Sequence, residues 1–184
     1  MIKILDNILT KEECLELIDL AEDKFTPSKV LGNQIEGYRT AQNTWIYDQT
    51  VLTNKIKDII VKETNLPIEN QENIHIVKYE IEGEYKDHHD FFHPGEDYYD
   101  RVIERGGQRV YSCLIYLNDD FTGGETYFPN KNITITPKLG RVVIWRNLKK
   151  DNLLDYDSLH AGLPVKSGKK YISVIWIREN NYKK

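Results

Sequence analysis

The sequence predicts a mainly β fold, a sandwich or a jelly roll, with helices at its N-terminal end. Two observations predict it. Helical periodicity is confined to the first third of the chain, and many short β-rich segments follow Pro67. Such a pattern is typical of a β core with a helical buttress. With 184 residues the chain is about one domain. We expect a single domain over 1–184, with a helical buttress over about 1–66 and the β core over about 67–180.

Two helices are expected before Pro67. Thr10 and Glu13 have the spacing of a capping box, in which each side chain bonds the backbone of the other residue. Apolar residues then recur on one helical face: Cys14, Leu17, Ile18 and Ala21. A second helix is expected over about 52–64, ended by Asn65-Leu66-Pro67. Its inward residues should be Ile56, Ile59 and Ile60.

The β-rich segments are separated by glycine and proline, which favour turns. They are Ile74–Tyr79, Val110–Leu117, Glu125–Phe128, Asn132–Thr136, Arg141–Trp145 and Tyr171–Ile177. Between the first two lies a charged stretch, His93–Gly107, that contains Pro94-Gly95 and Gly106-Gly107. We expect this stretch to be a long mobile loop.

Composition excludes several classes of function. The formal charge is −4, the pI is about 5.8 and no long basic run occurs, so nucleic acid is not an expected partner. No stretch approaches the roughly 18 apolar residues of a membrane span. Asp6 interrupts the N-terminus before the apolar part of a signal peptide could form, so we expect a cytoplasmic protein. Cys14 and Cys113 are expected to be buried free thiols.

A candidate metal site lies in Tyr85-Lys86-Asp87-His88-His89-Asp90. In a strand, residues i and i+2 point to the same face, so His88 and Asp90 would present an imidazole beside a carboxylate. His160 is the candidate third ligand, and two histidines with one carboxylate leave positions open on an iron ion. The spacing alone leaves a solvated loop open, and also the reversed pair Asp87 and His89. His75 is expected to belong to the sheet and His93 to the surface.

A series of further motifs in order along the chain carries a resemblance. They are Tyr38-Arg39-Thr40, Thr44-Trp45, Leu66–Asn70, Val77–Glu80, Tyr85–Phe92, Gly106–Arg109, Tyr116–Asn118, Gly123–Pro129, Pro137–Gly140, Ser158–Val165, Gly168–Tyr171 and Ile175–Arg178. In order and spacing the chain resembles the prolyl 4-hydroxylase family of Fe(II)/2-oxoglutarate oxygenases over nearly its whole length. The resemblance implies a double-stranded β-helix (jelly-roll) core.

The resemblance also implies the roles of the site residues. His88, Asp90 and His160 match the family's catalytic metal ligands, which hold Fe(II). Lys170, ten positions after His160, matches the basic residue that pairs with the far carboxylate of 2-oxoglutarate. Strand alternation sends its neighbour Lys169 to the opposite face. Tyr79 matches a tyrosine whose hydroxyl helps to hold 2-oxoglutarate.

Four residues resemble the family's peptide-binding positions: Arg39, Tyr85, Arg109 and Trp176. Arginine and aromatic side chains suit an extended proline-containing chain, because they stack on rings and donate to carbonyl groups. For each residue singly, a structural role is an equal alternative. The family's Arg-Thr-Ser pattern is broken by Ala41, so one substrate hydrogen bond is expected to be missing. The stretch His93–Gly107 matches a lid over the substrate groove.

The implied activity is hydroxylation of peptidyl proline at C4, coupled to conversion of 2-oxoglutarate and O₂ to succinate and CO₂. Ascorbate is the implied reductant, and a proline-containing peptide or protein the implied partner. Three alternatives remain: the same chemistry on another side chain, a free amino acid or a damaged base; a non-catalytic peptide-binding jelly roll; and a zinc hydrolase using the same three ligands.

Overall fold

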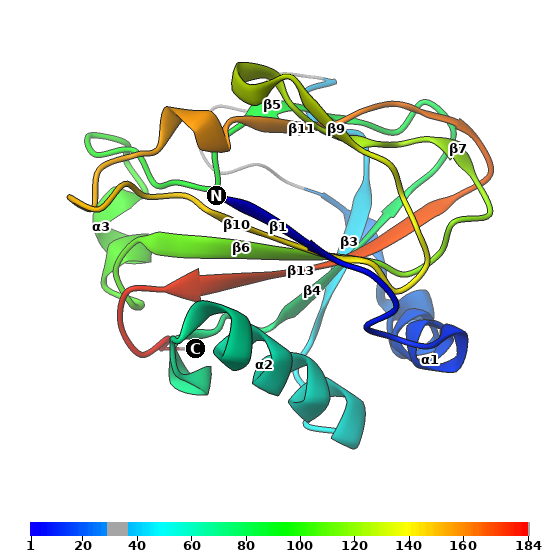
Figure 1. Ribbon diagram of the computed structural model, residues 1–184, viewed down its shortest axis with the longest axis horizontal. Helices are drawn as coiled ribbons and strands as arrows, with labels where there is room; N and C mark the ends of the chain where they lie inside the picture. The colour runs from blue at the N-terminus through cyan, green and yellow to red at the C-terminus, as the bar shows by residue number, and fades with distance from the viewer. Residues whose placement is uncertain (29–36, 184) are drawn as a thin grey trace.

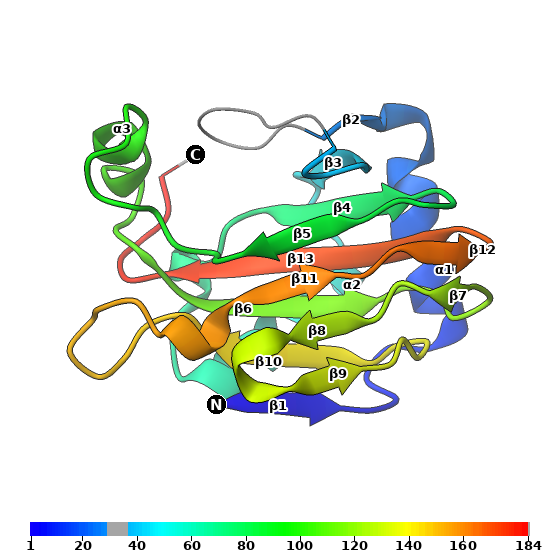
Figure 2. The same ribbon diagram turned by 90° about the horizontal axis from the view of Figure 1, so that it is seen from above.

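Two β-sheets face each other, and helices cover the outer face of the larger sheet (Figure 1). This arrangement comes from a computed structural model that describes residues 1–28 and 37–183. It confirms the predicted mainly β fold with N-terminal helices. Seen from above, the smaller sheet lies over the larger one (Figure 2). Residues from both sheets line the cavity described below.

The large sheet has seven described strands, arranged β1-β10-β6-β13-β4-β3-β2. In that order they are Ile2–Leu5, Val142–Arg146, Arg109–Tyr116, Lys170–Arg178, Ile74–Tyr79, Gln42–Ile46 and Thr26–Pro27. The small sheet runs β5 (Tyr85–His88), β11 (His160–Gly162), β8 (Thr126–Phe128) and β9 (Ile133–Ile135). A separate pair joins β12 (Val165–Ser167) to β7 (Thr122–Gly123).

The helices are α1 (Lys11–Ala21), α2 (Val51–Thr64) and α3 (Tyr99–Ile103), with short 3-10 turns at Glu22–Lys24, Ile68–Asn70, Pro129–Lys131 and Tyr156–Ser158. The capping box of α1 is confirmed: the Glu13 amide donates to Thr10 Oγ1 at 3.2 Å, and the Thr10 amide donates to Glu13 Oε2 at 2.9 Å. Helix α2 begins with a similar reciprocal pair, Thr50 and Thr53. Across the described chain, no helix has the length and apolar character needed to span a membrane.

All six predicted strands are present, with ends that differ by at most one residue. The expected helical buttress over 1–66 is wrong as a purely helical segment, because β1, β2 and β3 from this part of the chain extend the large sheet on both sides. These strands are short and carry polar residues among the apolar ones. Their pairing partners are distant in sequence, as with β1 and β10, so local periodicity does not reveal them.

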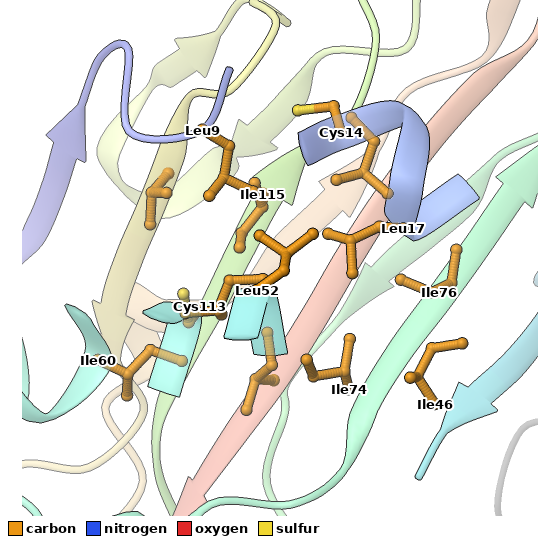
Figure 3. Packing of buried hydrophobic residues seen from close by; sticks show 14 of the residues in the cluster. Leu9, Cys14, Leu17, Ile46, Leu52, Ile60, Ile74, Ile76, Cys113 and Ile115 are labelled. Carbon is orange, nitrogen blue, oxygen red and sulfur yellow. The ribbon is translucent and has the colours of Figure 1, made fainter. Parts of the chain in front are cut away.

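Strand alternation divides the large sheet between two environments. On β4, Ile74 and Ile76 face the helices, whereas Val77 and Tyr79 face the small sheet. Figure 3 shows the helix side, where apolar residues from α1 and α2 pack onto the sheet around Cys14 and Cys113. Both cysteines are free and fully buried there, as predicted. The helix side is therefore an apolar core, and the opposite face is available for the site.

The stretch His93–Gly107 is not wholly irregular, because it contains α3. Val102 in this helix is buried, and its carbonyl accepts a hydrogen bond from Arg178 at the end of β13. Arg105, just after α3, donates to the Lys183 carbonyl at 3.1 Å. The predicted loop is thus a segment docked against the C-terminal end of the chain.

The prediction for the buried face of α2 needs one correction, which also supplies a test. Ile56 and Ile60 are fully buried, but Ile59 is only partly buried, at the edge of the apolar stripe. We expect Ile60→Ala to lower the free energy of unfolding by about 2–5 kcal/mol. Ile59→Ala should cost clearly less, because the side chain is already in contact with solvent. Urea unfolding of both variants checks this, and equal losses would contradict the packing described.

Candidate metal centre and cavity

Antiparallel pairing of β5 with β11 brings together two histidines that lie far apart in the sequence, His88 and His160. These residues are directly paired between β5 and β11, which lie side by side in Figure 2. Their ring centroids lie 4.2 Å apart. Asp90 follows β5 by two residues. Its Oδ1 lies 4.0 Å from His88 Nε2 and its Oδ2 lies 3.7 Å from His160 Nε2. One ligand atom of each residue falls within 4.8 Å of the others, so the three side chains can hold one metal ion.

Hydrogen bonds orient each of the three candidate ligands. Nδ1 of His88 donates to the Lys86 carbonyl at 2.7 Å, and Nδ1 of His160 donates to the Ser158 carbonyl at 2.9 Å. These bonds leave both Nε2 lone pairs directed toward Asp90, which is the tautomer a metal requires. Asp90 is held from the other side, because Ser112 Oγ donates to its Oδ2 at 2.7 Å.

The electrostatics of the cluster favour the metal-binding protonation states. Burial, together with the nearby His160, lowers the pKa of His88 well below its usual value, so its imidazole is neutral. Burial alone would raise the pKa of Asp90. The facing imidazoles, Arg109 and the Ser112 hydrogen bond outweigh it, and the pKa is lowered. A neutral imidazole beside a carboxylate suits a divalent ion such as Fe(II).

The reversed pair, Asp87 and His89, does not form a site. Asp87 is exposed, and His89 packs edge-on against Tyr156 with ring centroids 6.1 Å apart. His75 lies in β4, as expected, and His93 is exposed.

Lys170 and Tyr79 lie at one end of the cavity that contains the metal cluster. The cavity has a volume of about 1260 Å³. The two residues are paired between β13 and β4, and Lys170 Nζ lies 4.9 Å from the centre of the Tyr79 ring. Lys170 is 1 % exposed and has no ion-pair partner among the described residues. Burial, offset only in part by Glu125, lowers its pKa to about 7. Lys169, in contrast, is exposed and pairs with Glu80 at 3.2 Å.

Arg39 and Tyr85 lie on the wall next to His88. The Tyr85 ring stacks on the His88 imidazole with centroids 3.5 Å apart, and the Arg39 guanidinium lies 4.7 Å from the centre of the Tyr85 ring. Both side chains line the cavity. The stack supports one candidate metal ligand while presenting a cation to the cavity.

Arg109 and Trp176 line the other side of the cavity, but Arg109 also has a structural role. Its guanidinium lies 3.6 Å from the centre of the Trp176 ring. It makes a bidentate ion pair with the buried Glu72, at 2.8 and 3.0 Å. Trp176 is 8 % exposed. Glu72 therefore fixes the position of the Arg109 guanidinium in the cavity wall.

Several supporting residues were missed from the sequence. Asn147 Nδ2 donates to Ser112 Oγ at 2.9 Å and so holds the hydroxyl that bonds Asp90. Gln108 bonds both the amide and the carbonyl of Phe92, at 2.9 and 2.6 Å, and fixes the segment after Asp90. A buried polar residue within an apolar strand, as at Ser112, is a usable signal. No feature of the neighbouring sequence marks Glu72 or Asn147 as a residue that supports the site.

Comparison with known proteins agrees with this geometry. Residues 74–178 match the family described as the 2OG-Fe(II) oxygenase superfamily. A "Putative prolyl 4-hydroxylase" of Acanthamoeba polyphaga mimivirus is 36 % identical over 97 % of this chain and 74 % of that protein. "Prolyl 4-hydroxylase 2" of Arabidopsis thaliana is 32 % identical over 98 % of this chain and 68 % of that protein.

Solved structures are similar over the same length. The viral collagen prolyl hydroxylase of Paramecium Bursaria Chlorella virus-1, in complex with 2OG, has a TM-score of 0.78 at 28 % identity. That match covers 96 % of this chain and 95 % of the viral one. A Pseudomonas putida prolyl-4-hydroxylase, 17 % identical with a TM-score of 0.68, shows the shared jelly-roll fold alone. The chain belongs to the prolyl 4-hydroxylase family of the 2OG-Fe(II) oxygenase superfamily.

Proposed function

We propose that this protein is an Fe(II)- and 2-oxoglutarate-dependent prolyl 4-hydroxylase that acts on peptidyl proline and releases succinate and CO₂. The observation that carries the proposal is a combination within one cavity. A cluster of two histidines and one carboxylate shares the cavity with a buried lysine that makes no ion pair with any described residue. The first can hold the metal and the second can pair with a dicarboxylate.

His88, Asp90 and His160 would hold the iron, and their hydrogen-bonded supports would keep them in place before it binds. When bound, the iron and 2-oxoglutarate would supply the activation of O₂ and the oxidation of the C–H bond. Ascorbate would act outside this reaction, as a reductant that returns oxidised iron to Fe(II). Ser112 prevents rotation of the Asp90 carboxylate by occupying Oδ2. The backbone carbonyls on Nδ1 keep both imidazoles in the required tautomer.

Lys170 and Tyr79 would bind 2-oxoglutarate. A lone buried ammonium is costly, and an incoming carboxylate removes that cost by forming a charge-assisted pair. Gly162 lies close by: a Cβ at this position would be 3.7 Å from Lys170 Nζ. The absence of a side chain keeps the space beside the ammonium open for the co-substrate.

Arg39, Tyr85, Arg109 and Trp176 would bind the peptide. Proline lacks an N–H group, so a proline-rich chain presents carbonyl acceptors in excess of donors. Guanidinium groups beside aromatic rings match such a ligand, because they donate to carbonyls while the rings pack against proline.

The cavity offers little support for the hydrolase alternative. Among the described residues that line it, the carboxylates are Glu72, Asp87 and Asp90. Glu72 is paired with Arg109 and Arg178, and Asp87 is exposed. Neither is placed as a free general base beside the cluster, whereas the buried Lys170 suits a dicarboxylate. A peptide binder without catalysis would need neither the metal cluster nor the lysine.

Loss of one ligand tests the metal assignment. We expect His160→Ala to abolish both Fe(II) binding and succinate formation, because two of three ligands on one face do not hold the ion tightly. His93→Ala, which removes an exposed histidine, should bind Fe(II) as the unmodified protein does. Anaerobic calorimetry with Fe(II) and a succinate assay with a proline-rich peptide measure the two effects. Metal binding that survives in His160→Ala would show the assignment to be wrong.

Removal of the Lys170 charge should weaken 2-oxoglutarate binding about 10- to 100-fold, as expected for a hydrogen bond between charged groups. Lys170→Met retains most of the apolar stem, and Lys169→Met is the matched control for the neighbouring exposed lysine. Fe(II) affinity should be unchanged in both variants. Calorimetric titration of the Fe(II)-loaded proteins with 2-oxoglutarate measures this, and an equal loss in the two lysine variants would remove the proposed role.

The affinity for 2-oxoglutarate should depend on pH with a defined sign. The pKa of Lys170 in the free protein is lowered to about 7, so the ammonium is present below this value and is lost above it. The bound carboxylate favours the charged form, so binding above pH 7 must take up a proton. We expect the affinity to fall by up to about tenfold per pH unit above 7. Titrations between about pH 7 and 9 test this, and Lys170→Met should show no such slope.

A further inference from the structure

The cavity continues past the metal cluster along a row of alternating guanidinium groups and aromatic rings, which we name the cation–aromatic ladder. At its outer end the Arg105 and Arg178 guanidiniums lie 5.0 and 5.9 Å from the centre of the Tyr182 ring. Arg178 and Arg109 then lie 4.7 and 4.8 Å from the centre of the Phe92 ring. Each ring thus lies near two cations, and all five side chains line the cavity.

The inner end of the ladder passes from Arg109 over Trp176 to His75 and Trp45. The centroids of the Trp176 and His75 rings lie 5.4 Å apart, and those of His75 and Trp45 lie 4.4 Å apart. His75 is 3 % exposed, and its Nδ1 has no hydrogen-bond partner in the described part of the chain. Burial lowers the pKa of His75 well below its usual value, and the positive charges of Arg39 and Arg109 lower it further.

The guanidiniums of the ladder outnumber the described carboxylates that pair with them. Of the described side chains, only the Glu72 carboxylate makes an ion pair with its guanidiniums, and it is shared by Arg109 and Arg178. Arg105 donates to the Lys183 carbonyl and to the Tyr182 hydroxyl, which are both uncharged. Among the described residues that line the cavity, five side chains are cationic and three are carboxylates. Fe(II) and the 2-oxoglutarate dianion would cancel each other, so this excess remains for the substrate.

We propose that the cation–aromatic ladder binds an acidic side chain near the target proline, so that the enzyme prefers acidic proline-containing peptides over neutral or basic ones. The proposal deepens the proposed function and rests on it. Charge complementarity identifies the occupant: an extended peptide supplies carbonyl groups and proline rings to the ladder, and one carboxylate offsets its free positive charge. Arg105 is the cation best placed to respond to that carboxylate, because no described carboxylate neutralises it and it is exposed.

Interleaved cations and aromatic rings also occur in sites for single-stranded nucleic acid. Two observations favour the peptide. The chain carries a net charge of −4. The segment around α3, which also carries Arg105, adds Glu96, Asp97, Asp100 and Glu104, which are exposed and do not line the cavity. A polyanion would extend past these carboxylates and be repelled by them. A single acidic side chain inside the cavity would not have to pass them.

The test compares peptides that differ in one residue. Proline-containing peptides with Glu, Gln or Lys at each of the three positions on either side of the proline are assayed with the Fe(II)-loaded enzyme and 2-oxoglutarate. At one position at least, we expect the KM for the Glu peptide to be about tenfold lower than for the Gln peptide, with a similar kcat. The Lys peptide should have the highest KM. Added salt should reduce the advantage of Glu.

Two variants on the same segment locate the effect. Arg105→Gln should remove most of the preference for Glu over Gln, and Arg105→Glu should reverse it in favour of Lys. Arg101→Gln is the matched control, because Arg101 lies in α3, is exposed and does not line the cavity. Equal KM values for the Glu and Gln peptides at all positions would overturn the proposal. So would an equal loss in the Arg101 and Arg105 variants.

Failure of the proposed function would look different from failure of this inference. If no peptide yields hydroxyproline, the proposed function fails, and anisotropy of labelled peptides on the Fe(II)- and 2-oxoglutarate-loaded protein without O₂ still measures the charge preference. If the Glu peptide binds no more tightly than the Gln peptide in that assay, the inference is overturned. Oligothymidylate that competes more strongly than the Glu peptide also overturns it, in favour of a nucleic-acid ligand.

Discussion

The antiparallel register of β5 and β11 is the constraint on which the site depends. It places His160 directly opposite His88, although the residues lie far apart in sequence, and Asp90 completes the cluster at the end of β5. A slip of one residue would send one histidine to the other face of the sheet. The register changes between His160 and Gly162, which lies opposite Tyr85. The same short pairing thus positions the metal cluster and leaves the space that Lys170 requires.

The large sheet supports this arrangement because its two faces have separate tasks. Alternation on β4 commits Ile74 and Ile76 to the helix side, where they pack in an apolar core (Figure 3). The alternate residues of β4 face the cavity, and two of them, His75 and Tyr79, are polar and buried there. Burial of polar groups lowers stability, so the apolar core beneath the sheet offsets the cost of a polar active face.

Sequence patterns predicted what depends on local periodicity, which includes the capped helix α1 and six strands: β4, β6, β8, β9, β10 and β13. They missed β5 and β11, because these strands are short and polar, and their pairing is visible only in three dimensions. The spacing of His88 and Asp90 left Asp87 and His89 as an equal choice, and only the resemblance along the chain decided it. Glu72 and Asn147 were missed because they act through residues distant in sequence, Arg109 and Ser112.

Two buried charges in the cavity show opposite solutions to the same cost. Glu72 is surrounded by the guanidiniums of Arg109 and Arg178, and removal of this carboxylate would leave two adjacent cations unpaired. Lys170 has no such partner within the described chain and carries its charge at the expense of a lowered pKa. A compensated charge fixes structure, and here it holds Arg109 against Trp176. A buried charge without a partner, such as Lys170, favours binding of a ligand of opposite charge. The cavity therefore has fixed side chains along the ladder and still favours a dicarboxylate beside Lys170.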